Sequence, residues 1–252
     1  MVEHHIIMSS SYVDGVRIAL DFHGDTTKNR MEIAKAICEI KATCGDDVSL
    51  STHFLTTELS EWSSVREFDP FFEDVKLIGS VADFVSCIQK SRVLTGLDVA
   101  TYILTKTRCT HLSLEKLVYF AYAEYLCSRS KRLFEDKIFA FTHGPVVESV
   151  YDAYKRSGYK YLEPYASEGD TKVETKVQRM AARSRILFAE DGINKLKSID
   201  ATLGEYGKLT AGTLVSLTHR AGSPWSMTDS SKAYQLITDE LIREHHDVER
   251  IR

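Results

Sequence analysis

The sequence has few cysteines and no long apolar run. Its five cysteines are odd in number and widely spread, and none forms a CxxC pair, which argues against a disulfide framework and a structural zinc site. No apolar run approaches the roughly 18 residues that a membrane-spanning helix needs. The first residues also lack the basic and apolar regions of a secretory signal. We therefore expect a cytoplasmic protein whose thiols are reduced.

The common signatures of nucleotide binding and of nucleophilic catalysis are missing as well. The chain has no GxGxxG or phosphate-binding loop and no GxSxG elbow. Cys109 and Cys127 have no base that the sequence places beside them. These absences predict a protein without cofactor and give no support to nucleophilic catalysis.

Length and charge indicate two units. The 252 residues are 43% hydrophobic and 27% charged, as in ordinary globular proteins, and carry a formal charge of −4. Residues 1–90 hold 8 basic against 15 acidic side chains, a net of −7, whereas residues 91–252 hold 24 against 21, a net of +3. We therefore predict an acidic N-terminal accessory unit over residues 1–90 and a second unit over 91–252.

The first unit has the pattern of a small α/β fold. Residues 16–22 are rich in strand formers and end at the turn signal His23-Gly24-Asp25. Apolar residues then recur at helical spacing from Thr27 until Gly45. Residues 48–55 alternate between apolar and polar, and residues 81–88 share a helical face.

The second unit is predicted to be mainly α, with a short extended segment within residues 133–142. Helices are expected to start near residues 95, 113, 190, 210 and 231, and Pro145 is expected in the first turn of another. Residues 117–126 are apolar on most sides, which is typical of a helix in the middle of a bundle. Residues 159–177 are polar and are interpreted as a loop or arm, and the charged tail after residue 243 as frayed.

Asp21, His23 and Asp25, at the end of a predicted strand, are the best candidates for a metal or acid/base site. Such strand-end loops bind divalent metals in α/β proteins. A second carboxylate cluster, which a two-metal hydrolase needs, is not evident downstream. A metal-dependent hydrolase that uses this loop remains an alternative. We interpret the histidine pairs near the two ends of the sequence, His4-His5 and His245-His246, as solvated.

Two other features concern partners. Tyr119, Tyr122 and Tyr125 share one predicted helix, so their hydroxyls must reach water or polar partners, either in the core or at an interface. Basic residues near Arg183 and Arg185 are interleaved with acidic ones, which favours a solvated arm over a nucleic-acid site. Without a convincing helix-turn-helix, a regulator of its own operon is a weak alternative.

Three segments, in order, resemble a known family. Residues 114–121, LEKLVYFA, are similar to its LxKLLYFA helix, and residues 141–154 are similar to its W-x-x-GPVxxxVYxxY segment, with Phe141 where a Trp is common. Residues 217–225 are similar to its LTHxxxxPW ending, with a longer spacing between His219 and Pro224. Over about residues 94–240, the chain resembles the Panacea domain of phage-associated, SocA-like antitoxins.

The resemblance implies a helical binding domain that neutralises a cognate protein toxin encoded nearby, often one related to small alarmone synthetases. In other members the domain is an adaptor that delivers its toxin to a protease. It implies no catalytic or metal residue in this domain, and no membrane. The partner-binding or family-signature residues that it implies are Lys116, Tyr119, Tyr122, His143, Gly144, Pro145, Tyr151, His219 and Trp225.

Overall fold

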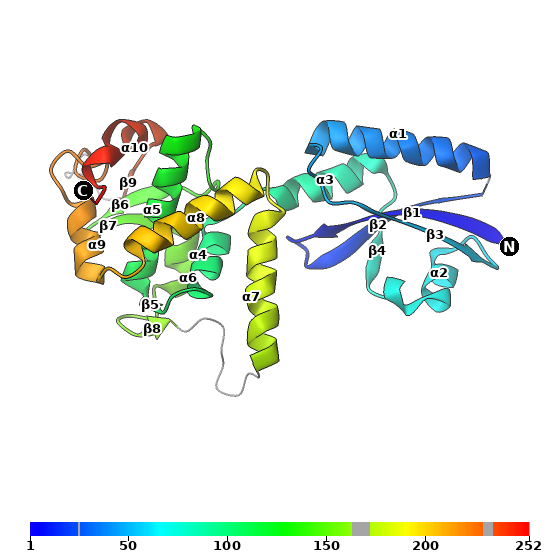
Figure 1. Ribbon diagram of the computed structural model, residues 1–252, viewed down its shortest axis with the longest axis horizontal. Coiled ribbons are helices and arrows are strands. Elements are labelled where there is room, and N and C mark those ends of the chain that lie inside the picture. Colours follow the sequence, from blue (N-terminus) through cyan, green and yellow to red (C-terminus); the bar gives the residue numbers. More distant parts are fainter. Residues whose placement is uncertain (25, 163–171, 229–233, 252) are drawn as a thin grey trace. The chain divides into compact units, whose positions relative to one another are not determined.

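A computed structural model describes residues 1–24, 26–162, 172–228 and 234–251 (Figure 1). The chain forms two compact units, residues 1–92 and 93–252. Asp25 lies outside the described residues. Residues 163–171, which belong to the segment interpreted as a loop or arm, lie outside them as well. No helix among the described residues is long and apolar enough to cross a membrane.

The first unit is built on a four-stranded sheet in the order β3-β1-β2-β4. Strand β1 is antiparallel to both of its neighbours, and β4 is parallel to β2. The strands are β1 (Val2–Ser11), β2 (Val16–His23), β3 (Ser51–Thr57) and β4 (Val75–Leu77). The middle of each central strand is buried on both faces, at residues 4–8 of β1 and residues 18–20 of β2.

Helices cover both faces of this sheet (Figure 1). On one face, α1 (Thr26–Cys44) and α3 (Val81–Arg92) pack against Ile7, Ile18 and Leu20. On the other face, Ile6 and Met8 pack with residues of α2 (Trp62–Phe68) and of the 3₁₀ helix η1 (Pro70–Phe72). The prediction of a small α/β unit is confirmed, because period-2 alternation in β1 and β2 supplies both cores.

The second unit surrounds one buried helix, α5 (His111–Arg129). Almost every residue from Ser113 to Leu126 is buried, which confirms the prediction of a central helix. Around it lie helices of the same core, namely α4 (Gly96–Leu104), α6 (Glu148–Tyr154), α7 (Lys172–Leu187), α8 (Gly192–Tyr206), α9 (Ala211–Thr218) and α10 (Asp239–His245). Thr95 opens α4 with a capping box and Thr110 caps α5.

Short strands complete the second unit. A three-stranded sheet has the order β7-β6-β9, formed by β6 (Ile138–Phe141), β7 (Gly144–Val147) and β9 (Gln235–Leu236). A second small sheet pairs β5 (Cys109–Thr110) with β8 (Tyr161–Leu162). The 3₁₀ helix η2 (His246–Val248) follows α10.

The prediction that Pro145 lies in the first turn of a helix was wrong. Pro145 belongs to β7, where it pairs with Ala140, and α6 begins only at Glu148. Proline is tolerated because β7 is an edge strand of its sheet. The Val147 N–H, which a longer helix would have left near its N-terminus, instead donates to the Glu115 carboxylate at 3.0 Å. A tertiary contact therefore displaced the helix start.

Three predictions in the C-terminal half were also wrong. The segment interpreted as a loop over 159–177 contains β8 and the start of α7, and Arg185 of α7 is paired with Asp98 rather than solvated. Residues 231–233 of the helix expected from residue 231 lie outside the described residues; among the described ones this helix begins at Asp239, where the Thr238 side chain caps it and β9 precedes it. The tail is not frayed, because η2 is formed and Glu249 is fully buried.

Candidate functional site

Lys116 connects the central helix to the β6–β7 hairpin. Its side chain is fully buried on α5, and its Nζ donates to the Pro145 carbonyl oxygen at 2.5 Å. Burial lowers the pKa of Lys116 to about 8, although the neighbouring carboxylates of Glu115 and Glu249 oppose this shift. A buried amine held to a backbone carbonyl positions the hairpin, because breaking the contact would leave a polar group unpaired.

Gly144 begins β7 at the point where Lys116 meets the last turn of α9. Its φ is +100°, and a Cβ at this position would lie 2.7 Å from the Thr218 Oγ1 and 3.0 Å from the Lys116 Cε. Both the backbone conformation and the close approach exclude a side chain here. Gly144 is thus required for the hairpin to pack against α5 and α9.

His219 and Trp225 hold the other side of the same hairpin. Their ring centroids are 3.7 Å apart, and the Trp225 Nε1 donates to the Phe141 carbonyl at 2.8 Å. The His219 Nε2 lies 3.3 Å from the Thr142 carbonyl oxygen. The three sequence segments that carry the resemblance therefore meet at the β6–β7 hairpin, although they lie far apart in the chain.

The remaining signature residues lie in different environments. His143 is exposed at the tip of the hairpin. Tyr119 and Tyr122 are buried, and their hydroxyls donate to Glu249 at 2.8 Å and to Asp239 at 2.7 Å. Burial, together with these acidic acceptors, raises the pKa of both tyrosines. Their hydroxyls are satisfied within the unit.

A pocket of about 290 Å³ lies beside the hairpin. Strands β6 and β7, helix α6 and the segment before β9 form its walls. Its lining is aromatic and acidic: Phe139, Phe141, Val146, Glu148, Tyr151, Asp152 and Tyr234. Tyr151 is half-buried and is the one signature residue in this lining.

Aromatic rings and carboxylates have distinct places in the pocket. The Phe141 ring packs edge-on against Tyr151 and Tyr234, with centroid distances of 5.0 and 4.9 Å. Glu148 and Asp152, four residues apart on α6, are both exposed. Asp152 forms an ion pair with Lys155 at 2.6 Å, whereas Glu148 has no ion-pair partner among the described residues. The pocket thus combines π faces with a negative rim.

Sequence reasoning found only part of this pocket. Phe141 and Tyr151 belong to the recognised segment, but Tyr234 was assigned to a helix, and Asp152 was not distinguished from a surface residue. The i, i+4 spacing of Glu148 and Asp152 could have indicated that both carboxylates lie on one face of a helix. No sequence pattern indicates that Tyr234 belongs to the pocket, because only the fold brings it to Phe141.

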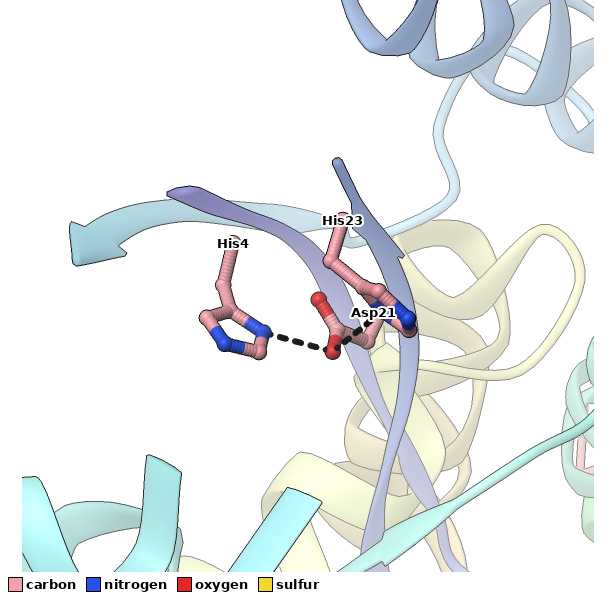
Figure 2. A group of neighbouring side chains, drawn as sticks. All are labelled: His4, Asp21 and His23. Carbon is pink, nitrogen blue, oxygen red and sulfur yellow. Dashed lines mark hydrogen bonds and ion pairs between the residues drawn. The ribbon is translucent and has the colours of Figure 1, made fainter. Parts of the chain in front are cut away.

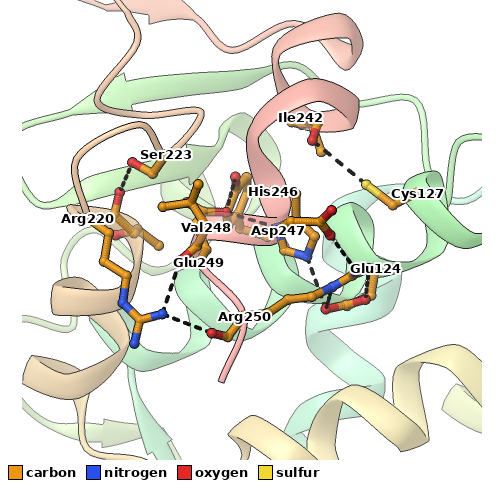
Figure 3. A network of polar contacts seen from close by, with 12 residues as sticks. Glu124, Cys127, Arg220, Ser223, Ile242, His246, Asp247, Val248, Glu249 and Arg250 are labelled. Carbon is orange, nitrogen blue, oxygen red and sulfur yellow. Dashed lines mark hydrogen bonds and ion pairs between the residues drawn. The ribbon is translucent and has the colours of Figure 1, made fainter. Parts of the chain in front are cut away.

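A buried polar network ties the end of the described chain to α5 (Figure 3). His246 contacts Glu124 through Nε2 at 3.1 Å and Glu249 through Nδ1 at 2.9 Å. Arg250 donates to both oxygens of Glu124, at 3.0 and 2.8 Å. The interpretation of His246 as solvated was therefore wrong: its ring is fully buried because carboxylates hold both of its nitrogens.

A second polar cluster lies on the sheet of the first unit (Figure 2). His4 and Asp21 are buried side chains joined at 2.7 Å, and the half-exposed His23 lies 3.3 Å from the same Asp21 oxygen. His4 and His5 are buried in β1, so the interpretation of this pair as solvated was wrong. Strand pairing on both sides of β1 buries them. Of the predicted metal candidates, Asp21 and His23 belong to this cluster.

Two comparisons with known proteins found a match to this chain. The sequence model of the family described as antitoxin SocA-like, Panacea domain, matches residues 114–226. Antitoxin SocA of Caulobacter vibrioides is 24% identical to this chain over 147 residues, which cover 56% of the chain and 74% of the relative. No solved structure matches. Residues 114–226, which include most of the central helix, the hairpin and the His219–Trp225 contact, are therefore similar to antitoxin SocA-like Panacea domains.

Proposed function

We propose that this protein is an antitoxin that neutralises a cognate protein toxin by direct contact. The Panacea domain and the likeness to antitoxin SocA support an antitoxin role. The observation that supports direct binding is the pocket beside the hairpin, which has aromatic walls and an acidic rim. This role requires a complementary surface and no chemical step.

The chemistry of the pocket favours a basic side chain of the toxin as its occupant. The rings of Phe141, Tyr151 and Tyr234 offer π surface, and each cation placed over such a ring gains roughly 0.5–2 kcal/mol. The Glu148 carboxylate, which has no ion-pair partner within the described part of the chain, would pair with the same cation. An arginine satisfies both, because its flat guanidinium stacks on rings and binds a carboxylate through two N–H groups.

The buried signature residues would serve binding indirectly. Lys116 and Gly144 hold the hairpin from inside, and Trp225 holds the Phe141 carbonyl. Because Phe141 also lines the pocket, these three residues would position one wall of the pocket without contacting the toxin themselves. This explains why residues of the recognised motif are buried in a protein whose role is to bind.

Coexpression tests the proposal. The product of the neighbouring gene is expressed alone and together with this protein, and growth and toxin level are measured. We expect growth arrest by the toxin alone, rescue in coexpression, and an unchanged toxin level. A toxin level that falls on coexpression would instead indicate delivery to a protease. A harmless neighbour, or a toxin that stays active beside this protein in soluble form, would refute the proposal.

A further inference from the structure

The register of the first sheet brings two histidines and one aspartate together. In the antiparallel pairing of β1 with β2, His4 lies directly opposite His23, and Asp21 precedes His23 by two residues. Residues two apart on a strand face the same side of the sheet. One nitrogen or oxygen from each of the three residues therefore lies within 4.8 Å of the others.

Hydrogen bonding determines which His4 nitrogen carries a hydrogen. The Nε2 lies 2.9 Å from the Thr57 Oγ1 and 3.2 Å from the Leu59 carbonyl oxygen. Thr57 donates its own hydroxyl hydrogen to that carbonyl, so Oγ1 is free to accept. A carbonyl oxygen only accepts. The Nε2 is therefore the protonated nitrogen of His4, and the Nδ1 faces the Asp21 carboxylate (Figure 2).

A neutral His4 would direct the lone pair of its Nδ1 at a carboxylate oxygen 2.7 Å away. This arrangement needs a positive charge between the two atoms. A proton on Nδ1 or a divalent cation would supply it, and the His23 Nδ1, 3.3 Å from the same oxygen, is placed to bind the same cation. The buried Oδ1 of Asp21 has no hydrogen-bond partner among the described residues. A divalent cation would take lone pairs from both imidazoles and from the carboxylate, whereas a proton on Nδ1 would pair His4 with Asp21 alone.

We propose that His4, Asp21 and His23 bind one Zn²⁺ ion. Zinc takes imidazole nitrogen and carboxylate oxygen at about 2.0–2.2 Å in tetrahedral geometry, so its ligand atoms lie roughly 3.3–3.5 Å apart. The 3.3 Å between His23 and Asp21 fits this spacing, and His4, at 2.7 Å from the same oxygen, would move away from it by roughly half an ångström when the ion binds. The contact of the His4 Nε2 with the Leu59 carbonyl is the support that metal-binding histidines commonly have. Three protein ligands leave one position open, on the side where His23 is 45% exposed.

This inference does not depend on the antitoxin role, because the three ligands lie outside the matched residues 114–226. It also differs from the loop suggested by the sequence, since His4 comes from another strand. The Zn²⁺ ion would join β1 to β2 at the end of the sheet where β3 ends at Thr57 and Leu59 follows it.

Zinc titration of the full-length protein, freed of metal with a chelator, tests the inference. We expect one Zn²⁺ per chain by calorimetry, and a melting temperature that rises with added Zn²⁺. His23→Ala removes an exposed ligand with little effect on packing and should weaken zinc binding by at least about tenfold. Asp21→Asn keeps the shape of the side chain but removes its charge, and should act in the same direction.

His245→Ala is the matched control, since it removes another partly exposed histidine beside a carboxylate. It should leave the zinc affinity unchanged. Circular dichroism of each variant establishes that the fold is retained. If the wild type binds no Zn²⁺, or if His23→Ala and Asp21→Asn bind it as the wild type does, the inference is wrong.

Discussion

The Tyr119 hydroxyl donates a hydrogen bond of 2.8 Å to the Glu249 carboxylate, a residue 130 positions later in the chain. Both side chains are fully buried. Glu249 also contacts His246, which reaches Glu124 on the same helix as Tyr119. Polar groups thus bind the central helix to the last described segment (Figure 3), and those of Tyr119, His246 and Glu249 are fully buried.

Replacing Tyr119 with Phe tests how much this hydrogen bond contributes to the free energy of unfolding. The variant keeps the ring but removes a donor to a buried carboxylate, so we expect a loss of about 1–3 kcal/mol in the free energy of unfolding. Urea denaturation measures it. Tyr159→Phe, at a position that is 96% exposed, is the control and should have no effect. Equal stability of both variants would contradict a structural role for the Tyr119 hydroxyl.

The network also predicts how stability depends on pH. Burial alone would lower the pKa of His246, but its hydrogen bonds to Glu124 and Glu249 outweigh burial and raise it. A raised pKa means that protonated His246 stabilises the fold below about pH 6.5, and that this contribution is lost as the pH rises through the raised value. Stability should therefore fall more steeply above about pH 6.5 in the wild type than in His246→Gln. Parallel profiles would refute this.

The ionisation of Glu124 predicts a second loss of stability, at acidic pH. Burial opposes its ionisation, but hydrogen bonds from His246 and Arg250 lower its pKa to about 2. Its stabilising contribution is present above about pH 4.5 and is lost as the pH falls towards 2. Denaturation midpoints between pH 5 and 2.5 should therefore fall less in Glu124→Gln than in the wild type, although this variant starts from lower stability.

Gly144→Ala should destabilise the second unit more than a positive φ alone explains. The backbone strain of a non-glycine residue there costs about 1–3 kcal/mol, and the new Cβ would also meet Thr218 and Lys116. Gly24→Ala is the matched control, because Gly24 has a φ of +112° but open space around it. The difference between the two losses in unfolding free energy measures the contact. A loss at Gly144 no larger than at Gly24 would contradict it.

Charge reversal tests the pocket. Glu148→Lys places a cation beside the site proposed for a basic toxin side chain, so it should abolish rescue in coexpression while the protein remains folded. Tyr151→Ala should weaken rescue by removing ring surface. Glu39→Lys makes the same charge change at an exposed position of α1 and should rescue as the wild type does. Full rescue by Glu148→Lys would show that the toxin binds elsewhere.

If the second unit recognises the toxin, a fragment of residues 93–252 should be sufficient to bind it. The seam after Arg92 separates two units with their own cores, so we expect the fragment to fold and to bind the toxin in a pull-down. Circular dichroism establishes folding. A folded fragment that fails to bind would move recognition to the first unit.

Local pattern predicted much of the fold. Strand-forming residues before a turn signal located the strand at 16–22, and apolar residues at helical spacing located the helix closed by Gly45. A segment that is apolar on most sides located the buried helix of residues 113–126. These elements could be predicted because their burial follows from the residues of a single segment. The hairpin at Gly144 could not, since Pro145 suits a helix start equally well until Glu115 takes the Val147 N–H.

The functional sites divide in the same way. Residue identity alone pointed to Lys116, Gly144, Tyr151 and Trp225 as parts of a Panacea domain and marked Asp21 and His23 as candidate ligands. Only the tertiary structure placed His4 opposite His23 and Tyr234 against Phe141. It also buried His246, which its position in the sequence had suggested was solvated. Periodicity and motif report what a segment prefers, whereas pairings between distant segments depend on strand register and on buried charges that must find partners.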